Sequence, residues 1–232
     1  MKNRPATVTC CLIFLLQLNI SFGQAFSISF DHRVGPELLR LDSGNYTNSA
    51  GQPFNITKFR YYIGNISLEN EKGKLYRVNN YFLIDEDNST SKKIILPHVP
   101  ADHYKFIRFI IGVDSIHNVS GAQSGALDPL NGMFWTWNTG YIFLKLEGRS
   151  PASALAGNIF EYHIGGYKRP NNCIRQIELP LTGSSRSLKI AVDVAKMLEG
   201  PAPLDFKELP SVTGPAGSVS IADRYARMFS IE

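Results

Sequence analysis

The sequence has few cysteines, only three among its 232 residues. Two of them, Cys10 and Cys11, lie in the apolar N-terminal segment, so only Cys173 belongs to the remainder of the chain. One cysteine cannot form an internal disulfide, and a metal site built on a pair of thiolates is excluded as well. We therefore expect a fold that depends on its hydrophobic core and not on crosslinks.

Long hydrophobic runs are also scarce. The run at residues 10–16 is about half as long as the ~20 residues that span a bilayer. It follows two basic residues and is followed by small residues around Gly23, a pattern typical of a secretory signal peptide. We predict that residues 1–23 are a Sec signal peptide cleaved near Gly23. Residues 24–232 would then form one secreted or periplasmic domain without a permanent membrane anchor.

The chain lacks a strong charge of either sign and lacks the common enzyme motifs. It has 24 basic and 20 acidic residues, and cleavage of the signal peptide would remove two basic residues and no acidic one. A balance this close to neutral does not predict nucleic-acid binding. There is no Gly-x-Ser-x-Gly elbow, His-Glu-x-x-His pair or phosphate loop, so we predict a protein that is not an enzyme and has no catalytic residues.

What the sequence does contain is a series of short segments with alternating apolar and polar residues, separated by turn-forming clusters. About nine such segments favour an all-β fold, an antiparallel, Ig-like β-sandwich, with a barrel as the alternative. Only residues 192–198 and 221–229 have a helical pattern. The nine predicted strands are residues 26–30, 54–68 with a break near Gly64, 75–84, 92–96, 104–113, 141–146, 160–164, 174–181 and 187–194.

Two long connections stand out. Residues 114–138 are too many for an ordinary hairpin loop, and loops of this length are usually functional or disordered. Because this segment contains Met133, Trp135 and Trp137, we expect it to be ordered. Residues 200–220 are rich in proline and glycine, and we expect them to run over the surface.

Several motifs together resemble one known family. The segments that carry the resemblance are Gly112 to Gly121, Asn131-Gly132-Met133-Phe134-Trp135-Thr136-Trp137-Asn138-Thr139-Gly140-Tyr141, Lys145-Leu146-Glu147-Gly148, Phe160-Glu161-Tyr162-His163-Ile164-Gly165-Gly166, Phe30-Asp31-His32, Tyr61-Tyr62-Ile63-Gly64-Asn65-Ile66 and the ending from Ile221-Ala222-Asp223 to Met228-Phe229. The combination resembles the MbnP family of periplasmic copper-binding proteins over nearly the whole mature chain.

This resemblance implies a β-sandwich that binds one copper ion. It also implies a partner di-haem oxidase of the MbnH/MauG type, which oxidises a tryptophan of the loop, Trp135 or Trp137, to kynurenine. Indole has an N–H donor and no lone pair to offer a metal, whereas opening its ring creates an aromatic amine and a ketone. Imidazole and thioether groups suit copper, so His163, His32 and Met133 are the candidate ligands.

One departure from the family pattern concerns the residue before the first tryptophan. Some members place a histidine there, whereas this chain has Phe134. If His32 replaces the missing ligand, a site with two histidines is retained. If it does not, His163 alone would make a weak site.

Other interpretations of the same residues remain open. A Trp-x-Trp pair is often core packing, and His163 in an apolar strand is by default a hydrogen-bonded core histidine. Alternatively, exposed rings of Trp135, Trp137 and Tyr141 would stack on a sugar or peptide in a binding module without metal.

A calcium ion is the second cofactor that we considered. Asp114, Asn118 and Asp128 offer oxygen ligands within the long loop. Their spacing matches no known calcium motif, and both aspartates lie beside turn residues. Caps for the loop backbone are thus the alternative interpretation.

Overall fold

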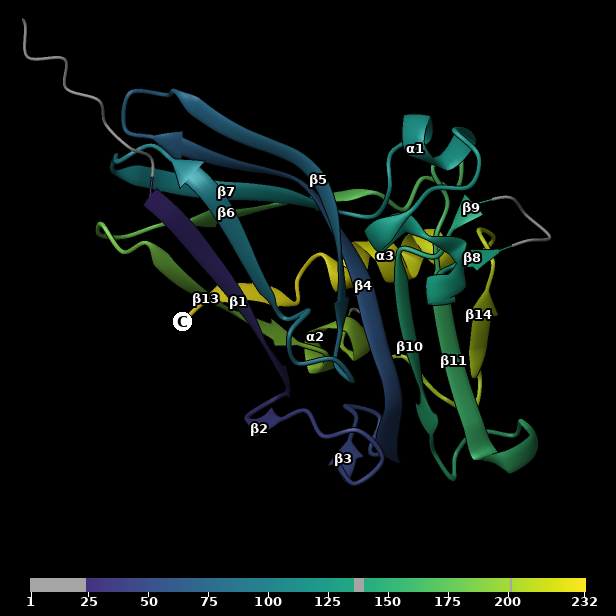
Figure 1. Ribbon diagram of the computed structural model, residues 1–232. Helices are drawn as coiled ribbons and strands as arrows, with labels where there is room; N and C mark the ends of the chain where they lie inside the picture. The colour runs from purple at the N-terminus through teal and green to yellow at the C-terminus, as the bar shows by residue number, and fades with distance from the viewer. Residues whose placement is uncertain (1–23, 136–139, 201) are drawn as a thin grey trace, which may run out of the picture.

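Two β-sheets packed face to face form the body of the protein in the computed structural model (Figure 1). The structure describes residues 24–135, 140–200 and 202–232. The predicted signal peptide at residues 1–23 and Trp137 lie outside the described residues. No helix of the described part is long and apolar enough to cross a membrane.

The smaller sheet is built around β1 (Gln24–Val34). On one side, β1 pairs in parallel with β13 (Ser187–Asp193), which pairs in turn with β15 (Phe229–Ile231). On its other side, β1 pairs antiparallel with β6 (Lys93–Val99) and the short β2 (Glu37–Leu38). Every second residue of β1 from Phe26 to Val34 is buried, as expected for a strand with one face on the core.

The larger sheet is organised by β4 (Pro53–Asn70), a strand of 18 residues. Its first part pairs with β10 (Leu144–Arg149), and its later part pairs with β7 (Tyr104–Ile111). Beyond β10 lie β11 (Ile159–Ile164) and β14 (Ser211–Thr213), and beyond β7 lies β12 (Arg175–Pro180). Two further strands, β3 (Tyr46–Thr47) and β5 (Leu75–Asp85), also pair with β4. In Figure 1, β10, β11 and β14 lie to the right, whereas β1 and β13 lie to the left.

A bulge in β4 lies just beyond the point where its partner changes from β10 to β7. Between Gly64 and Ser67, β4 has two residues where β7 has one, and Asn65 there adopts a φ of 51°. Gly64 is required at this point because a β-carbon there would lie 2.4 Å from the ring of Tyr81. The strand predicted with a break near Gly64 is therefore continuous, and the glycine marks a bulge.

Aromatic side chains join the two sheets. The ring of Phe30 on β1 contacts Tyr61 on β4 and Phe109 on β7 edge-to-face, at centroid distances of 6.2 and 6.4 Å. Phe229 packs on Phe109 at 5.4 Å. Such contacts add to the burial of apolar area, so the core is held by packing as the lack of disulfides requires.

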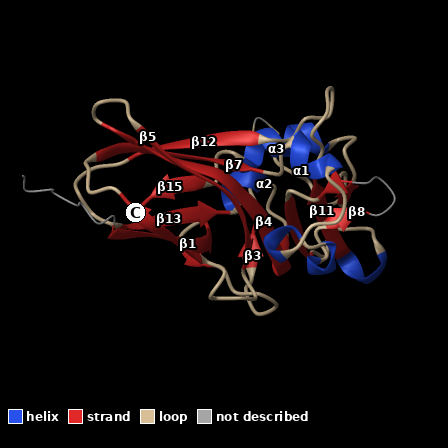
Figure 2. Ribbon diagram, turned by 45° about the horizontal axis from the view of Figure 1, so that its top comes forward, coloured by secondary structure: helices blue, strands red, loops and turns tan. Residues whose placement is uncertain are grey.

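The short helices gather toward one end of the molecule, around β8 and β11 (Figure 2). The long loop after β7 supplies α1 (Ser115–Val119), the 3-10 turns at Gly125–Leu127 and Pro129–Asn131, and β8 (Phe134–Trp135), which pairs with β9 (Gly140–Tyr141). The other helices are the 3-10 turn at Ala156–Asn158, α2 (Ala195–Leu198) and α3 (Ser218–Tyr225). The loop is thus ordered over its described residues.

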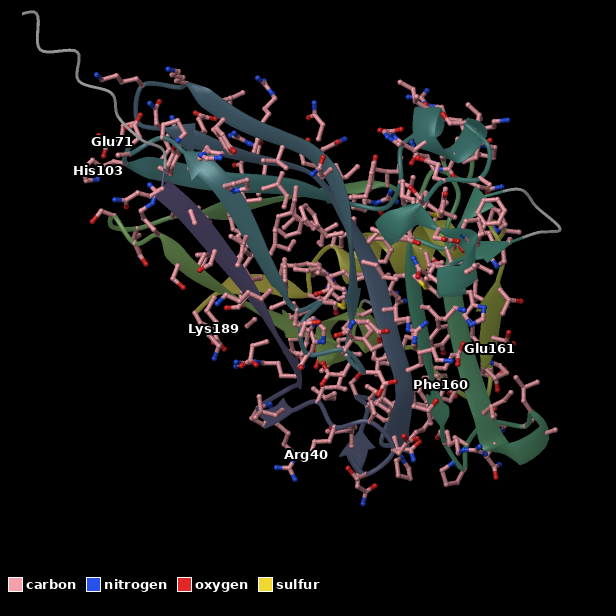
Figure 3. The ribbon with its side chains drawn as sticks, viewed as in Figure 1. Arg40, Glu71, His103, Phe160, Glu161 and Lys189 are labelled. Carbon is pink, nitrogen blue, oxygen red and sulfur yellow. The ribbon has the colours of Figure 1, made fainter. Side chains whose placement is uncertain are left out.

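The predicted all-β sandwich is confirmed, and each of the nine predicted segments contains a strand. Figure 3 shows the alternation on β11, where Phe160 is fully buried and Glu161 is not. Two pairings, β1 with β13 and β11 with β14, are parallel. The surface course expected for residues 200–220 is wrong in part. Leu204 and Phe206 are buried, and Phe206 stacks on Phe160 at 4.3 Å.

Candidate site beneath the tryptophan loop

The tryptophan loop, by which we mean the described residues 128–135 and 140–141, is fastened to the outer face of the larger sheet. The Arg60 guanidinium donates to the carbonyl oxygen of Asn131 at 3.2 Å, and the Lys145 ammonium donates to that of Gly132 at 2.6 Å. Arg60 and Lys145 are direct cross-strand partners on β4 and β10. Together they hold the loop against the sheet at two successive carbonyl groups.

Trp135 lies against the end of β11. A β-carbon at Gly165 would be 2.9 Å from the indole ring and 2.4 Å from the carbonyl oxygen of Tyr141. The close approach therefore depends on the absence of a side chain at Gly165. Met133 continues the same extended segment, because its carbonyl oxygen accepts from the Ile142 amide at 3.0 Å. Residues two apart on an extended chain share a side, so Met133 and Trp135 face the same way, and both are buried.

His163 is half-buried on the same outer face. It pairs directly with Lys145 across β10 and β11, two positions before Gly165. Its Nε2 lies 2.8 Å from Oε1 of Glu147, and Oε2 of the same carboxylate lies 3.4 Å from the Lys58 ammonium. The hydrogen bond from His163, reinforced by the Lys58 charge, lowers the pKa of Glu147 to about 2. An ionised Glu147 accepts a proton from Nε2, so whenever the ring is neutral the lone pair lies on Nδ1.

His32 occupies the opposite side of the larger sheet. It is 2 % exposed, and its two ring nitrogens contact Glu86 at 2.7 Å and the Tyr61 hydroxyl at 2.9 Å. Burial lowers the pKa of His32, which favours the neutral ring. Tyr61 follows Arg60 on β4, so the two side chains point to opposite faces.

The structure therefore does not bring His32 and His163 together. His163 pairs with Lys145 and Lys145 with Arg60, which places all three on the outer face. His32 bonds to the inward-facing Tyr61. The paired-histidine arrangement considered for copper fails because the strands place the two imidazoles on opposite sides of one sheet.

Of the copper candidates, His163 and Met133 are thus the donors left for a metal, and Met133 lies on the same extended segment as Trp135. Within residues 24–135, 140–200 and 202–232, no three side chains of histidine, cysteine, aspartate or glutamate are grouped as a metal site. Cys173 is buried, and burial raises the pKa of its thiol to about 12, which keeps it protonated. An imidazole and a thioether fit copper, especially in its reduced state, and fit harder cations poorly.

The residues considered for calcium serve the loop itself. The Asp114 carboxylate caps α1 by accepting from the His117 amide at 2.9 Å, and it also accepts from the Tyr81 hydroxyl. Asp128 caps the turn at Pro129–Asn131. The Asn118 amide donates to two backbone carbonyls and accepts from the Tyr141 amide at 3.0 Å. These bonds match the alternative interpretation, in which the three side chains cap the backbone of the loop.

The rings considered as a stacking platform are not exposed. Trp135 is 5 % and Tyr141 is 1 % exposed, and the Tyr141 hydroxyl donates to the Leu127 carbonyl at 2.7 Å. A sugar-binding platform needs open ring faces, so this arrangement argues against the surface-module hypothesis for these two residues.

Sequence reasoning missed three residues beneath the loop. Arg60 and Lys145 fasten it, and the one signal for them is a basic residue at an outward position of an apolar strand. Tyr62 is fully buried, and its hydroxyl has no hydrogen-bond partner among the described residues. Its ring meets that of Tyr141 edge-to-face at 5.8 Å, which places it under the loop.

Fold and site together define a two-sheet β protein whose clamped loop carries a thioether and an indole and lies on the sheet face that carries an imidazole. The MbnP family profile matches residues 23–214, and the chain belongs to this family. Among solved structures, MbnP from Methylosinus trichosporium is similar, with a TM-score of 0.56 and 16 % sequence identity over 90 % of this chain and 98 % of that chain. At this identity the likeness concerns the fold. No curated protein sequence matches the chain.

Proposed function

We propose that this protein binds copper in the periplasm or outside the cell, where it stores, scavenges or delivers the ion. The observation that supports the proposal is the clamped loop: it carries Met133 and Trp135, and Trp135 packs on Gly165, two residues beyond His163. MbnP is not a known family of enzymes, and the role proposed here is binding and not catalysis.

His163 and Met133 are the ligands that we assign. The Glu147 carboxylate orients the His163 ring through Nε2, so Nδ1 is the nitrogen offered to the ion. His32 is left out of the ligand set because both of its ring nitrogens bond to core groups. Its role is to join β1 to β4 and to Glu86 after β5.

A tryptophan of the loop completes the proposal. Two protein ligands make a weak site, and an intact indole cannot add a third. Oxidation of Trp135 or Trp137 to kynurenine would supply an amine and a ketone at the same place. A di-haem oxidase exported to the same compartment is the partner proposed for this step.

Copper titration of the mature chain tests the assignment. With Cu(I) and a competing chelator, His163→Ala and Met133→Leu should each weaken binding by about tenfold or more, a loss of about 1.4 kcal/mol or more. His103→Ala is the matched control, because His103 is exposed and lies far from β8 and β9 (Figures 1 and 3). Unchanged affinity in His163→Ala would refute the site.

Intact mass spectrometry tests the oxidation. The chain co-expressed with the oxidase should carry the mass change of tryptophan to kynurenine, and either Trp135→Phe or Trp137→Phe should abolish that change. An unmodified mass after co-expression would remove the kynurenine part of the proposal and leave the two protein ligands to be tested alone.

A further inference from the structure

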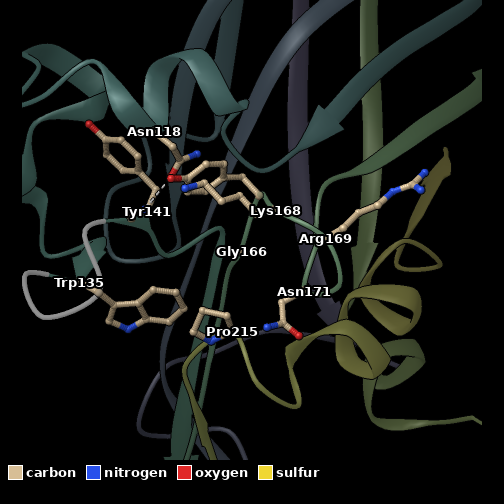
Figure 4. A pocket seen from close by; sticks show the side chains of 10 residues that line it. Asn118, Trp135, Tyr141, Gly166, Lys168, Arg169, Asn171 and Pro215 are labelled. Carbon is tan, nitrogen blue, oxygen red and sulfur yellow. Dashed lines mark hydrogen bonds between the residues drawn. The ribbon is translucent and has the colours of Figure 1, made fainter.

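A pocket of about 210 Å³ opens beside Trp135, between β8 and β9 and the segment that follows β11 (Figure 4). Its walls are mixed: Trp135, Tyr141, Tyr167 and Pro215 supply apolar and aromatic surface, and Asn118, Asn171 and two basic residues supply polar groups. Gly140 and Gly166 also line the pocket, and because they have no side chains they leave its space open. The pocket shares Trp135 with the site proposed for copper, but its lining includes neither His163 nor Met133, the two ligands assigned above.

The pocket is cationic. The ten described residues that line it include Lys168 and Arg169 and no aspartate or glutamate. Figure 4 shows Lys168 reaching over the pocket toward Asn118 and Tyr141, whereas Arg169 points away from it. The Lys168 ammonium also lies 5.1 Å from the centroid of the Tyr167 ring. One cation is therefore available to a molecule inside.

The walls are fixed before any ligand enters. Asn118 bonds to the backbone of Val113, Asp114 and Tyr141, so it locks α1 to β9. Gly166 has a φ of 131°, and a β-carbon there would lie 2.2 Å from the carbonyl oxygen of Asn171. A site whose walls are already ordered loses little conformational entropy on binding.

Size and chemistry define the ligand class. An apolar cavity of about 150 Å³ accommodates benzene, so a pocket of this volume accommodates one six-membered ring with a small substituent. Aromatic walls favour a planar ring, and a lysine without a neighbouring carboxylate favours an anion.

We propose that this pocket binds a small aromatic carboxylate, with the ring against Tyr167 and Pro215, beside the edge of Trp135, and the carboxylate at Lys168. The binding uses neither His163 nor Met133 and does not need a bound copper ion. Because the ring lies beside Trp135, occupancy changes the surroundings of the indole.

Benzoate is the probe for the mature chain, followed by two-dimensional NMR of backbone and indole N–H groups. Saturable shifts at Trp135, Gly166 and Asn171 are expected. Benzamide, which has nearly the same shape without the charge, should bind about three- to fivefold more weakly, the ratio expected for a partly exposed ion pair. No saturable shift with benzoate, or equal affinity for benzamide, would overturn the proposal.

Two neighbouring substitutions locate the cation. Lys168→Met should remove the preference for benzoate over benzamide, and Arg169→Met should retain it. Both residues are exposed, so neither change threatens the fold. Retention of the preference in Lys168→Met, or its loss in both variants, would show that the carboxylate is not held where we place it.

Discussion

The contact between Trp135 and Gly165 gives the sharpest test of how the loop is held. In Gly165→Ala the new methyl group would lie 2.4 Å from the Tyr141 carbonyl oxygen and 2.9 Å from the indole ring. Ordinary van der Waals contact begins near 3.4 Å. The first clash involves backbone, so no rotamer change relieves it, and β9 has to move away from β11 by about 1 Å.

The expected cost is that of an overpacked core, about 1–3 kcal/mol of unfolding free energy. For a domain of this size 1 kcal/mol corresponds to a shift of about 2–4 °C in Tm, so a loss of about 2–12 °C is expected. Calorimetry measures the shift, and tryptophan emission should move to longer wavelength as Trp135 gains contact with water.

Gly200→Ala is the matched control. The β-carbon there would clash with the end of the flexible Arg224 side chain, at 2.8 Å, which can move aside at little cost, and would make an ordinary contact with the Ala202 carbonyl oxygen at 3.5 Å. If Gly165→Ala unfolds within 1 °C of the parent chain and its emission is unchanged, the loop does not pack on β11 as described.

Three further predictions concern the buried polar groups. His32→Leu should lower the unfolding free energy by about 2–4 kcal/mol, because it leaves the Glu86 carboxylate and the Tyr61 hydroxyl without their buried partner. The same variant should bind copper with unchanged affinity. Lost copper affinity with unchanged stability would reverse the roles assigned to His32 and His163. Burial lowers the pKa of His32 from 6.5, so as pH falls below about 7 the unfolded chain binds a proton that the folded chain does not. The unfolding free energy from urea titrations should therefore decrease between pH 7 and 5, and it should decrease less in His32→Leu. An equal pH dependence in both chains would contradict this. Tyr62→Phe removes a buried hydroxyl that has no partner among the described residues, so it should raise the unfolding free energy by up to about 1 kcal/mol in chemical denaturation. A loss of more than about 1 kcal/mol would instead show that the hydroxyl is hydrogen-bonded in solution.

The strands could be predicted because their signal is local. A residue such as Phe30 or Phe160 alternates with polar neighbours, and turn clusters divide one strand from the next. The parallel pairing of β1 with β13 could not be predicted, since it joins residues about 160 positions apart. Phe206 was misplaced because a segment rich in proline and glycine gives no sign of a single ring inserted into the core.

The arrangement of the candidate site was even harder to predict from the sequence than the strand pairing. The resemblance drew attention to His32, His163 and Met133, but whether two histidines meet depends on which face each strand turns to the core. That choice is made by pairing over long distances, through Lys145 and Arg60 for His163 and through Tyr61 for His32. A sequence pattern fixes alternation along a strand and leaves open which partner each face meets.

The adjacency of Arg60 and Tyr61 on β4 has a consequence for how this family can vary. One peptide bond separates the residue that clamps the loop from the residue that binds His32 in the core. Gain or loss of a single residue between Lys58 and Tyr61 would turn this stretch of β4 over, driving Arg60 between the sheets and Tyr61 into solvent. Changes of length should therefore be tolerated best at the two bulges of β4, at Thr57 opposite β10 and around Asn65 opposite β7, where an extra residue is already accommodated, or outside the strand.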